Sequence, residues 1–289
     1  MKKKPLHKIF RGAITVKRSA IERGLLSLSW NHISKNTPAG DGHPVLIFPG
    51  FLTNDTFIAP LRECIAEKGY KVYGWEGGFN LGLDKKSAQQ MQTRLKEIFD
   101  ENGGRKITLI GHSLGGIYAR ELAREFPDMV RDVITLGTPF GGMHDKTATP
   151  SYLGDLYGQL NPATAHLLKS AKMSDRLLTP PPVPTTSIFS KTDETVEWHA
   201  CLNPAAPQTE NIQVHASHAG IPFNPTAINV ILDRLGQKEG QWKPFAASTS
   251  RLANFFYPSK GEKLNAPKNP DWDPAKIKTQ SLFKKTRPK

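Results

Sequence analysis

Hydrophobic and polar positions from residue 44 onward alternate between two patterns. Short apolar runs rich in β-branched residues are followed by longer segments in which apolar residues recur every three or four positions. The first pattern is typical of buried strands and the second of amphipathic helices. Strands that alternate with helices in this way indicate a mostly parallel sheet with helices on both of its faces.

Six short apolar runs predict the strands, and four segments with helical spacing predict the main helices. The predicted helices begin near Ile58, Ala88, Ser113 and Pro225, and glycines near several of their ends are typical stop signals. The sequence therefore predicts one α/β domain over residues 44–245. Its predicted strands are Val45–Phe48, Tyr70–Trp75, Lys106–Ile110, Val130–Leu136, Thr185–Ser190 and Ile212–Val214.

The interval between the fourth and fifth predicted strands is too long for an ordinary connection. Residues 137–184 separate these strands, whereas a common crossover needs only ~10–15 residues. The interval contains a predicted helix over Pro162–Lys172 and leaves through the stiff, proline-rich stretch 180–184. We interpret residues 143–184, approximately, as a small cap insertion over the carboxyl edge of the sheet.

The two ends of the chain are predicted to be basic extensions of this domain. Residues 246–289 are rich in proline, lysine and asparagine and predict a disordered tail. Residues 1–43 predict an amphipathic helix, which is interpreted either as docked on the domain or as lying on an anionic membrane. Its predicted apolar face consists of Ile9, Phe10, Ala13, Ile14, Ile21, Leu25 and Leu28.

The distribution of charge along the chain indicates which classes of molecule the protein could bind. The net charge of +13 arises from the flanks, with +7 in residues 1–43 and +8 in residues 238–289, while residues 44–237 carry −2. A basic groove through the domain is therefore not supported, and nucleic acid is not expected because no recognition motif is present. The basic flanks predict peripheral contact with an anionic membrane.

The sequence also bears on the location of the protein. No apolar run approaches the ~20 residues of a membrane span, and charged residues interrupt the hydrophobic region that a secretory signal would need. A cytoplasmic location is therefore expected.

The strongest chemical signal is the pentapeptide Gly111-His112-Ser113-Leu114-Gly115. It stands between a predicted strand and a predicted helix, which is the setting of a nucleophile elbow. In such an elbow the serine hydroxyl is held out at the carboxyl edge of the sheet. Ser113 is therefore the candidate nucleophile.

A serine nucleophile needs a general base, and the base needs a carboxylate that orients it. His218 lies in a loop after the last predicted strand and is favoured as the base, with His215 as the alternative. Asp193 follows the fifth predicted strand and is favoured as the acid, with the adjacent Glu194 as the alternative. The chain order of serine, acid and histidine fits this class of fold.

Two backbone N–H groups are needed to stabilise the oxyanion of acyl transfer. Leu114, directly after the nucleophile, supplies the first. Phe51 is the candidate for the second because it follows the first predicted strand, after a glycine at position 50 that lets the backbone turn.

These motifs resemble the α/β-hydrolase superfamily, and specifically its bacterial esterase/lipase branch, over about two thirds of the chain. The resemblance implies the same site residues, Ser113, Asp193, His218, Phe51 and Leu114, and no required cofactor or metal. The chain departs from this branch at Glu194 and Ala216, where the branch usually has glycine. The resemblance rests on the segments PVLIFPGF, GWEGGFNLG, TLIGHSLGGIYAREL, ITLGTPFGG, SIFSKTDETVEWHACL, ENIQVHASHAGIPFNP and WKPF.

The sequence thus predicts a serine hydrolase of carboxylic esters, with a small-molecule or lipid ester as substrate. No metal is expected, because the nine histidines and two cysteines show no ligand spacing. Two alternatives remain open. The first is an acyltransferase or thioesterase with the same triad, and the second is a non-catalytic protein attached to an anionic surface through its basic flanks.

Overall fold

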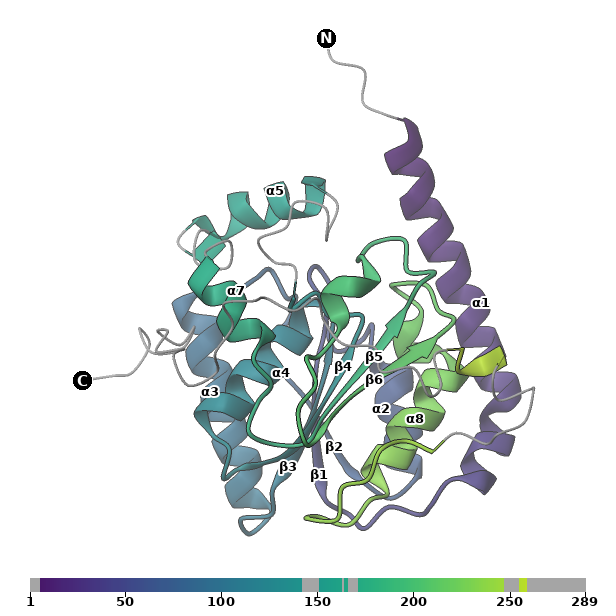
Figure 1. Ribbon diagram of the computed structural model, residues 1–289, viewed down its shortest axis with the longest axis vertical. Coiled ribbons are helices and arrows are strands. Elements are labelled where there is room, and N and C mark those ends of the chain that lie inside the picture. Colours follow the sequence, from purple (N-terminus) through teal and green to yellow (C-terminus); the bar gives the residue numbers. More distant parts are fainter. Residues whose placement is uncertain (1–5, 142–150, 163, 166–170, 247–254, 259–289) are drawn as a thin grey trace.

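A six-stranded parallel sheet forms the centre of the protein (Figure 1). The computed structural model describes residues 6–141, 151–162, 164–165, 171–246 and 255–258. The strand order is β2-β1-β3-β4-β5-β6, and every neighbouring pair runs parallel. The strands are β1 (Pro44–Phe48), β2 (Lys71–Gly74), β3 (Ile107–His112), β4 (Val130–Leu136), β5 (Thr185–Ser190) and β6 (Thr209–Val214).

Helices cover both faces of the sheet. On one face, α3 and α4 pack against the strands, and on the other face α2 and α8 do so, with α1 against α8 (Figure 1). The bounds of these helices are α1 (Leu6–Asn36), α2 (Ala59–Glu67), α3 (Lys85–Glu101), α4 (Leu114–Glu125) and α8 (Pro225–Leu235), and two short 3₁₀ helices are η1 (Trp198–Cys201) and η2 (Ile221–Phe223).

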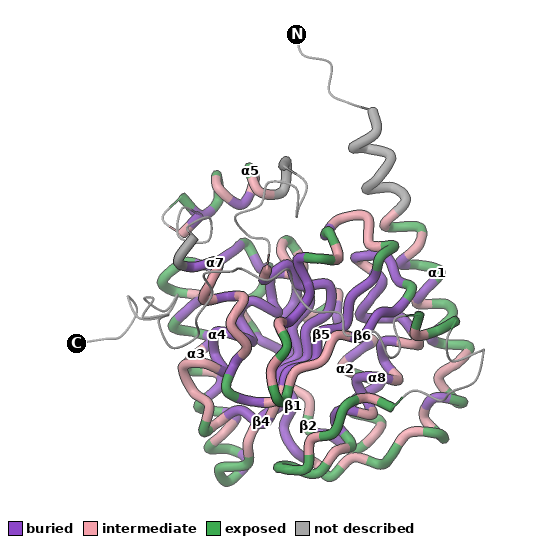
Figure 2. The backbone as a smooth tube through the Cα atoms, viewed as in Figure 1, coloured by how far each residue is buried: buried purple, intermediate pink, exposed green. Residues whose placement is uncertain are grey.

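Successive side chains along each strand point to opposite faces of the sheet and pack into two separate hydrophobic cores. On β1, Leu46 and Phe48 pack with α3 and α4, whereas Val45 and Ile47 pack with α2 and α8. Both sets are fully buried, as expected for a strand covered on both faces (Figure 2). The apolar runs of the sequence therefore predicted the strands correctly, and the α/β fold class with them.

The order of the strands places a topological switch point at β1. From β1 the chain passes to β2 on one side, and from β2 it returns to β3 on the other side of β1. Connections that leave in opposite directions open a crevice at such a switch point, which is where open α/β sheets bind ligands. The loops after β1 and β3 meet there.

Two described helices lie in the long interval between β4 and β5, namely α5 (Ser151–Leu160) and α7 (Ala171–Leu178). The helix predicted over residues 162–172 falls mainly outside the described residues, as do residues 143–150 of the predicted cap. The described part of the interval is tied to the loop after β2. Asn161 donates from Nδ2 to the carbonyl oxygen of Leu81 at 2.6 Å, and Thr164 donates from Oγ1 to that of Leu83 at 2.7 Å.

Helix α1 forms as the sequence predicts, but a different face of it docks on the protein. Leu26 and Ile33 are buried in the core beside α8, whereas Ile21, Leu25 and Leu28 are exposed. The remaining members of the predicted apolar face precede residue 15, where side chains are outside the described part. Most of the predicted tail, 247–254 and 259–289, is also outside it.

Candidate active site

The turn between β3 and α4 presents Ser113 at the carboxyl edge of the sheet. Strand β3 ends at His112, helix α4 begins at Leu114, and Ser113 between them has φ 51° and ψ −120°. Such a positive φ is uncommon for a residue with a side chain and is typical of strained functional turns. The backbone N–H of Ser113 donates to the carbonyl oxygen of Leu136 at 2.8 Å, which anchors the turn to β4.

Two glycines allow this turn to close. A Cβ atom at Gly111 would overlap the backbone of Gly115 and Gly116, and a Cβ atom at Gly115 would lie 2.6 Å from the carbonyl oxygen of Pro49. Any side chain at either position would push the helix away from the sheet. The Gly-x-Ser-x-Gly pattern is therefore required by the close approach of α4 to β1 and β3.

Ser113, His218 and Asp193 are joined by a continuous chain of hydrogen bonds. Oγ of Ser113 lies 3.0 Å from Nε2 of His218, and Nδ1 of His218 lies 2.7 Å from Oδ2 of Asp193. The other carboxylate oxygen, Oδ1, accepts from the backbone N–H groups of Thr195 at 2.7 Å and Val196 at 2.8 Å. These two bonds turn the Asp193 carboxylate toward the imidazole. Three side chains that are far apart in the sequence thus meet at one point.

The two alternative residues lie elsewhere. His215 is exposed, and its ring is 5.9 Å from that of Phe255. The Oε2 atom of Glu194 lies 3.0 Å from Nη1 of Arg18 in an ion pair. Neither side chain is bonded to the hydroxyl or the imidazole of the triad.

The loop after β1 lies directly beside Ser113. A Cβ atom at Gly50 would be 2.9 Å from Nδ1 of His112 and 3.3 Å from Cβ of Ser113. The N–H of Leu52 is bonded to the carbonyl oxygen of Asn80 at 2.7 Å, whereas no acceptor is found among the described residues for the N–H of Phe51 or Leu114. Both candidate oxyanion donors therefore remain available at this edge.

Comparisons with known proteins agree with this architecture. A family profile described as the alpha/beta hydrolase fold matches residues 43–164. The mature lipase BlEst2 of Bacillus licheniformis superposes with a TM-score of 0.51 at 18% identity, covering 69% of this chain and 94% of that one. The chain therefore has the α/β-hydrolase fold. The predicted fold class is thereby confirmed.

Two curated bacterial proteins are similar to part of this chain. A triacylglycerol lipase of Burkholderia plantarii is 29% identical over 118 residues, which is 38% of this chain and 33% of the relative. A triacylglycerol lipase of Pseudarthrobacter phenanthrenivorans is 30% identical over 115 residues, which is 37% of this chain and 36% of the relative. The similarity therefore spans about a third of the length of each relative.

Burial and the charges of nearby carboxylates act in opposite directions on the pKa of His218. Burial lowers the pKa, because a charged imidazolium loses contact with water. The carboxylate of Asp193 raises it through its charge and its hydrogen bond, and the charge of Glu194 raises it further. The carboxylates outweigh burial, so the pKa of His218 stands above its ordinary value of 6.5. The ring is thus well suited to hold a proton taken from Ser113.

Two side chains that support the candidate site were not assigned a role from the sequence. His112 donates from Nε2 to the carbonyl oxygen of His218 at 2.9 Å. Asn80 is fully buried, donates from Nδ2 to the carbonyl oxygen of Pro49 at 2.8 Å and accepts from Tyr118 Oη at 3.1 Å. Asn80 belongs to a glycine-rich segment of the family resemblance, but its partners are fixed only by the folded loops.

Neither a metal cluster nor a membrane span is found in the part of the chain that the structure describes. No group of three His, Cys, Asp or Glu side chains there is arranged to hold a metal ion. None of the helices in the same ranges combines the length and the apolar character needed to traverse a bilayer. Cys64 and Cys201 are buried free thiols, and burial raises the pKa of each.

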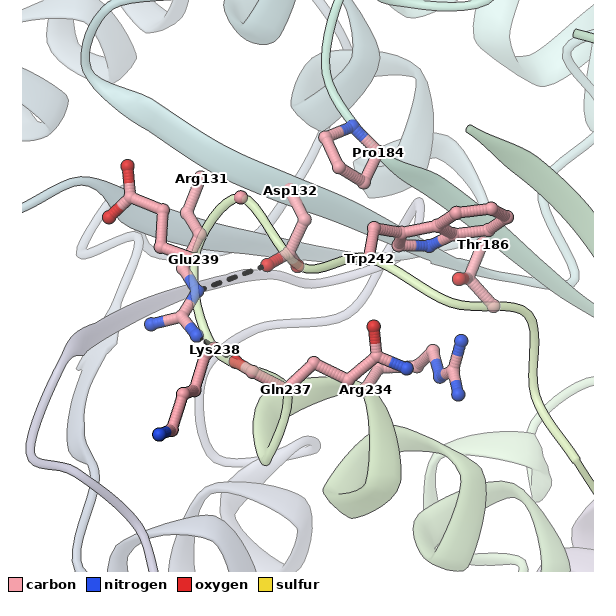
Figure 3. Close-up of a pocket in the computed structure, with 10 residues that line it drawn as sticks. Arg131, Asp132, Pro184, Thr186, Arg234, Gln237, Lys238, Glu239 and Trp242 are labelled. Carbon is pink, nitrogen blue, oxygen red and sulfur yellow. Dashed lines mark hydrogen bonds and ion pairs between the residues drawn. The ribbon is translucent and has the colours of Figure 1, made fainter. Parts of the chain in front are cut away.

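A separate pocket lies at the amino-terminal ends of strands β4 and β5 (Figure 3). Arg131 and Asp132 line it from the start of β4, and Thr186 lines it from the start of β5. Burial raises the pKa of Asp132 to about 6, although Arg131 lies 3.7 Å away and Thr108 donates to the carboxylate at 3.1 Å. Ser113 lies at the carboxyl-terminal ends of the strands, whereas this pocket lies at their amino-terminal ends. The pocket is therefore not part of the candidate site.

Proposed function

We propose that this protein is a serine hydrolase that cleaves carboxylic esters. In this proposal Ser113 is the nucleophile, His218 the general base and Asp193 the carboxylate that orients the imidazole. The observation that carries it is the pair of hydrogen bonds at 3.0 Å and 2.7 Å that joins the three side chains. Nucleophile, base and orienting acid within bonding reach are the arrangement that acyl transfer requires.

The proposed reaction proceeds in two halves. Oγ of Ser113 forms a bond to the ester carbonyl carbon while its proton passes to Nε2 of His218. The tetrahedral intermediate then collapses, the C–O bond to the alcohol breaks, and His218 gives its proton to the departing alkoxide oxygen. In the second half, water attacks the acyl-enzyme with His218 again as base, and the carboxylic acid leaves as Ser113 regains its proton.

The backbone N–H groups of Phe51 and Leu114 are proposed to bind the oxyanion of each tetrahedral intermediate. Leu114 is the first residue of α4, where N–H groups have no acceptor within the helix and the helix dipole favours negative charge. Such donors commonly contribute ~100–1,000-fold to the rate.

The chemical character of nearby loops supports an apolar acyl group in the substrate. Leu52 follows the Phe51 donor and is exposed, and the loop bonded to it carries two further exposed apolar side chains, Phe79 and Leu81. Leu160 at the end of α5 is exposed as well, close to Asn161, which is bonded to Leu81. Exposed apolar side chains on loops bonded to the loop beside Ser113 favour a lipid or other apolar ester over a charged peptide. The names of the two curated relatives support the same choice.

Labelling with a fluorophosphonate probe and hydrolysis of a series of nitrophenyl esters of increasing chain length test this function. We expect the wild type to be labelled, Ser113→Ala to be unlabelled and inactive, and longer acyl chains to be preferred. Equal labelling of both proteins, or of neither, would contradict the catalytic proposal and favour a non-catalytic binding protein. Added alcohols or coenzyme A that divert most of the acyl group from water would instead identify an acyltransferase or a thioesterase.

We also propose peripheral contact with an anionic membrane through the exposed side of α1. Ile21, Leu25 and Leu28 form an exposed apolar stripe at helical spacing, and residues 1–43 carry a net charge of +7. Apolar side chains beside basic ones are typical of helices that lie on anionic lipid surfaces.

Sedimentation with liposomes of anionic or neutral lipid tests this contact. We expect binding to anionic liposomes that weakens with salt, and weaker binding by a variant in which Ile21, Leu25 and Leu28 are replaced by serine. Binding that is equal for the variant and the wild type would exclude the stripe as the contact.

A further inference from the structure

Helix α1 docks through a face that contains a buried carboxylate. The buried residues Ser19, Glu22, Leu26 and Ile33 recur at helical spacing, and Glu22 is only 7% exposed. Leu26 and Ile33 contribute to the core with α8, but Glu22 adds a charge where an apolar residue would pack. Charged side chains are rarely buried unless hydrogen bonds or ion pairs compensate for the lost water.

The hydrogen bonds of Glu22 are made with the loop that carries His218. Oε1 accepts from the backbone N–H of Ser217 at 2.9 Å, and Oε2 accepts from the Ser217 hydroxyl. Nδ2 of Asn224 lies 3.5 Å from Oε1 and also donates to the carbonyl oxygen of His215 at 2.8 Å. The Glu22 carboxylate is therefore bonded to the residue that directly precedes the proposed base.

The loop is shaped around this carboxylate. A Cβ atom at Gly220 would overlap Oε2 of Glu22, so the backbone of the loop closes directly on the side chain. The N–H of Gly220 donates to the Ser217 hydroxyl at 3.0 Å, and that hydroxyl in turn donates to Glu22. Burial raises the pKa of Glu22, while the bonds from Ser217 and Asn224 counteract it.

Arg18, one helical turn before Glu22, contacts the loop that carries Asp193. Its Nη1 atom donates to the carbonyl oxygen of Thr192 at 2.7 Å and to Oε2 of Glu194 at 3.0 Å. Its Nη2 atom donates to the Thr192 hydroxyl at 3.1 Å. Arg18 therefore binds the residues on both sides of Asp193. One face of α1 thus contacts both the loop that carries Asp193 and the loop that carries His218.

We propose that Arg18 and Glu22 are positioning residues for the site, with Glu22 fixing the loop of His218 and Arg18 fixing the loop of Asp193. This inference rests on the proposed function. Neither side chain touches the triad atoms, so each acts through the backbone next to a triad residue. Catalytic geometry is sensitive to displacements well below 1 Å, and loops hold such geometry only when other groups support them.

Steady-state kinetics of Glu22 variants test the first half of the proposal, with Leu26→Ala as a matched control on the same helix face. Leu26→Ala loosens the docking of α1 but leaves the Glu22 bonds in place, so we expect lower stability with kcat near the wild-type value. Glu22→Ala should lower kcat tenfold or more with KM nearly unchanged. Glu22→Gln, which keeps an acceptor for the Ser217 N–H, should restore part of that loss.

The same measurements separate the two proposals. If the wild type neither reacts with the fluorophosphonate probe nor hydrolyses esters, the proposed function fails. If the wild type is active and Glu22→Ala retains as much kcat as Leu26→Ala, the positioning role fails while the function stands. Should Glu22→Ala not fold, Glu22→Gln and Ser217→Ala, singly and together, replace it. Non-additive losses in kcat would support the proposal, and additive losses would overturn it.

The proposed role of Arg18 is tested by the variant Arg18→Gln, with Lys17→Gln as the control. Both variants remove one positive charge from α1, but Lys17 is exposed and makes no contact with the acid loop. We expect a lower kcat and slower probe labelling for Arg18→Gln only. Equal kinetics for the two variants would overturn the role of Arg18.

Discussion

The imidazole of His112 donates a hydrogen bond to the backbone carbonyl of His218 over 2.9 Å. The residue before the proposed nucleophile therefore holds the backbone of the proposed base. Burial and the charge of His218 lower the pKa of His112 to about 3, so this ring is neutral and its proton lies on Nε2. His112 thus links the two turns without competing for the proton of Ser113.

Replacement of His112 by phenylalanine should reduce kcat about tenfold. The ring volume is kept, but the carbonyl oxygen of His218 loses its donor, which typically costs about 1–3 kcal/mol for a buried group. KM should change little, because no substrate contact is removed. The check is kcat measured alongside thermal unfolding, and an unchanged kcat in a destabilised protein would assign His112 a purely structural role.

The activity of the wild type should fall on the acid side with a midpoint above pH 6.5. Below its pKa, His218 carries a proton and cannot accept another from Ser113. Because the pKa of His218 is raised above 6.5, the fall is centred above that value. The measurement is the pH profile of kcat/KM, which reports the free enzyme.

Glu194→Gln should shift this acid limb to lower pH. The Glu194 charge helps to raise the pKa of His218, and glutamine removes the charge while keeping an acceptor for Arg18. Glu197→Gln is the matched control, since Glu197 is exposed and does not contribute to this pKa. Identical profiles for the two variants would contradict the electrostatic argument.

The conformation of the loop that carries Phe51, a proposed oxyanion donor, should depend on Asn80. Asn80→Ala removes the side-chain bonds to Pro49 and Tyr118, so the loop is expected to move and kcat to fall at least tenfold. Tyr118→Phe removes only the hydroxyl that donates to Asn80 and should have a much smaller effect. Kinetics with one nitrophenyl ester at saturation are sufficient, and equal losses in both variants would exclude a special role for the amide of Asn80.

Gly115→Ala should destabilise the protein by about 1–3 kcal/mol or more, because its Cβ atom would overlap carbonyl oxygens of β1 and the loop after it. Gly154→Ala on α5 is the control. No atom lies within 4 Å of a Cβ atom placed at Gly154. The better helix propensity of alanine should therefore stabilise the protein by about 0.5–1 kcal/mol. Urea denaturation measures both changes, and a neutral Gly115→Ala would show that the elbow tolerates a side chain.

The strands and the elbow were predictable because their signals are local. Buried parallel strands appear as short apolar runs, and strands β4 and β5 have the predicted bounds. The Gly-x-Ser-x-Gly turn is likewise contained in five consecutive residues. His218 and Asp193 were predicted from chain order, and the structure places both within bonding distance of their expected partners.

The docking face of α1 was not predictable for a physical reason. Hydrophobic spacing selects Ile21, Leu25 and Leu28, but the helix docks through Glu22 and Leu26. A buried carboxylate is compatible with docking only because Ser217 donates both its N–H and its hydroxyl to it. An acidic residue within a basic helix, at the spacing of Leu26 and Ile33, was the available signal. Its meaning depends on a loop 195 residues away in the sequence.

The separation between Glu22 and Ser217 also bears on biosynthesis. A ribosome makes α1 first, and the carboxylate at position 22 stays without its folded neighbours until nearly the whole domain has been translated. At a rate of about 5–20 residues per second, this wait lasts on the order of ten seconds or more. A nascent chain can build most of its sheet during that time, yet the bonds between Glu22 and Ser217 form only after residue 217 has been made. If α1 positions the loop of His218 as proposed, a gene that begins at residue 44 would encode Ser113, Asp193 and His218 without the helix that supports their loops.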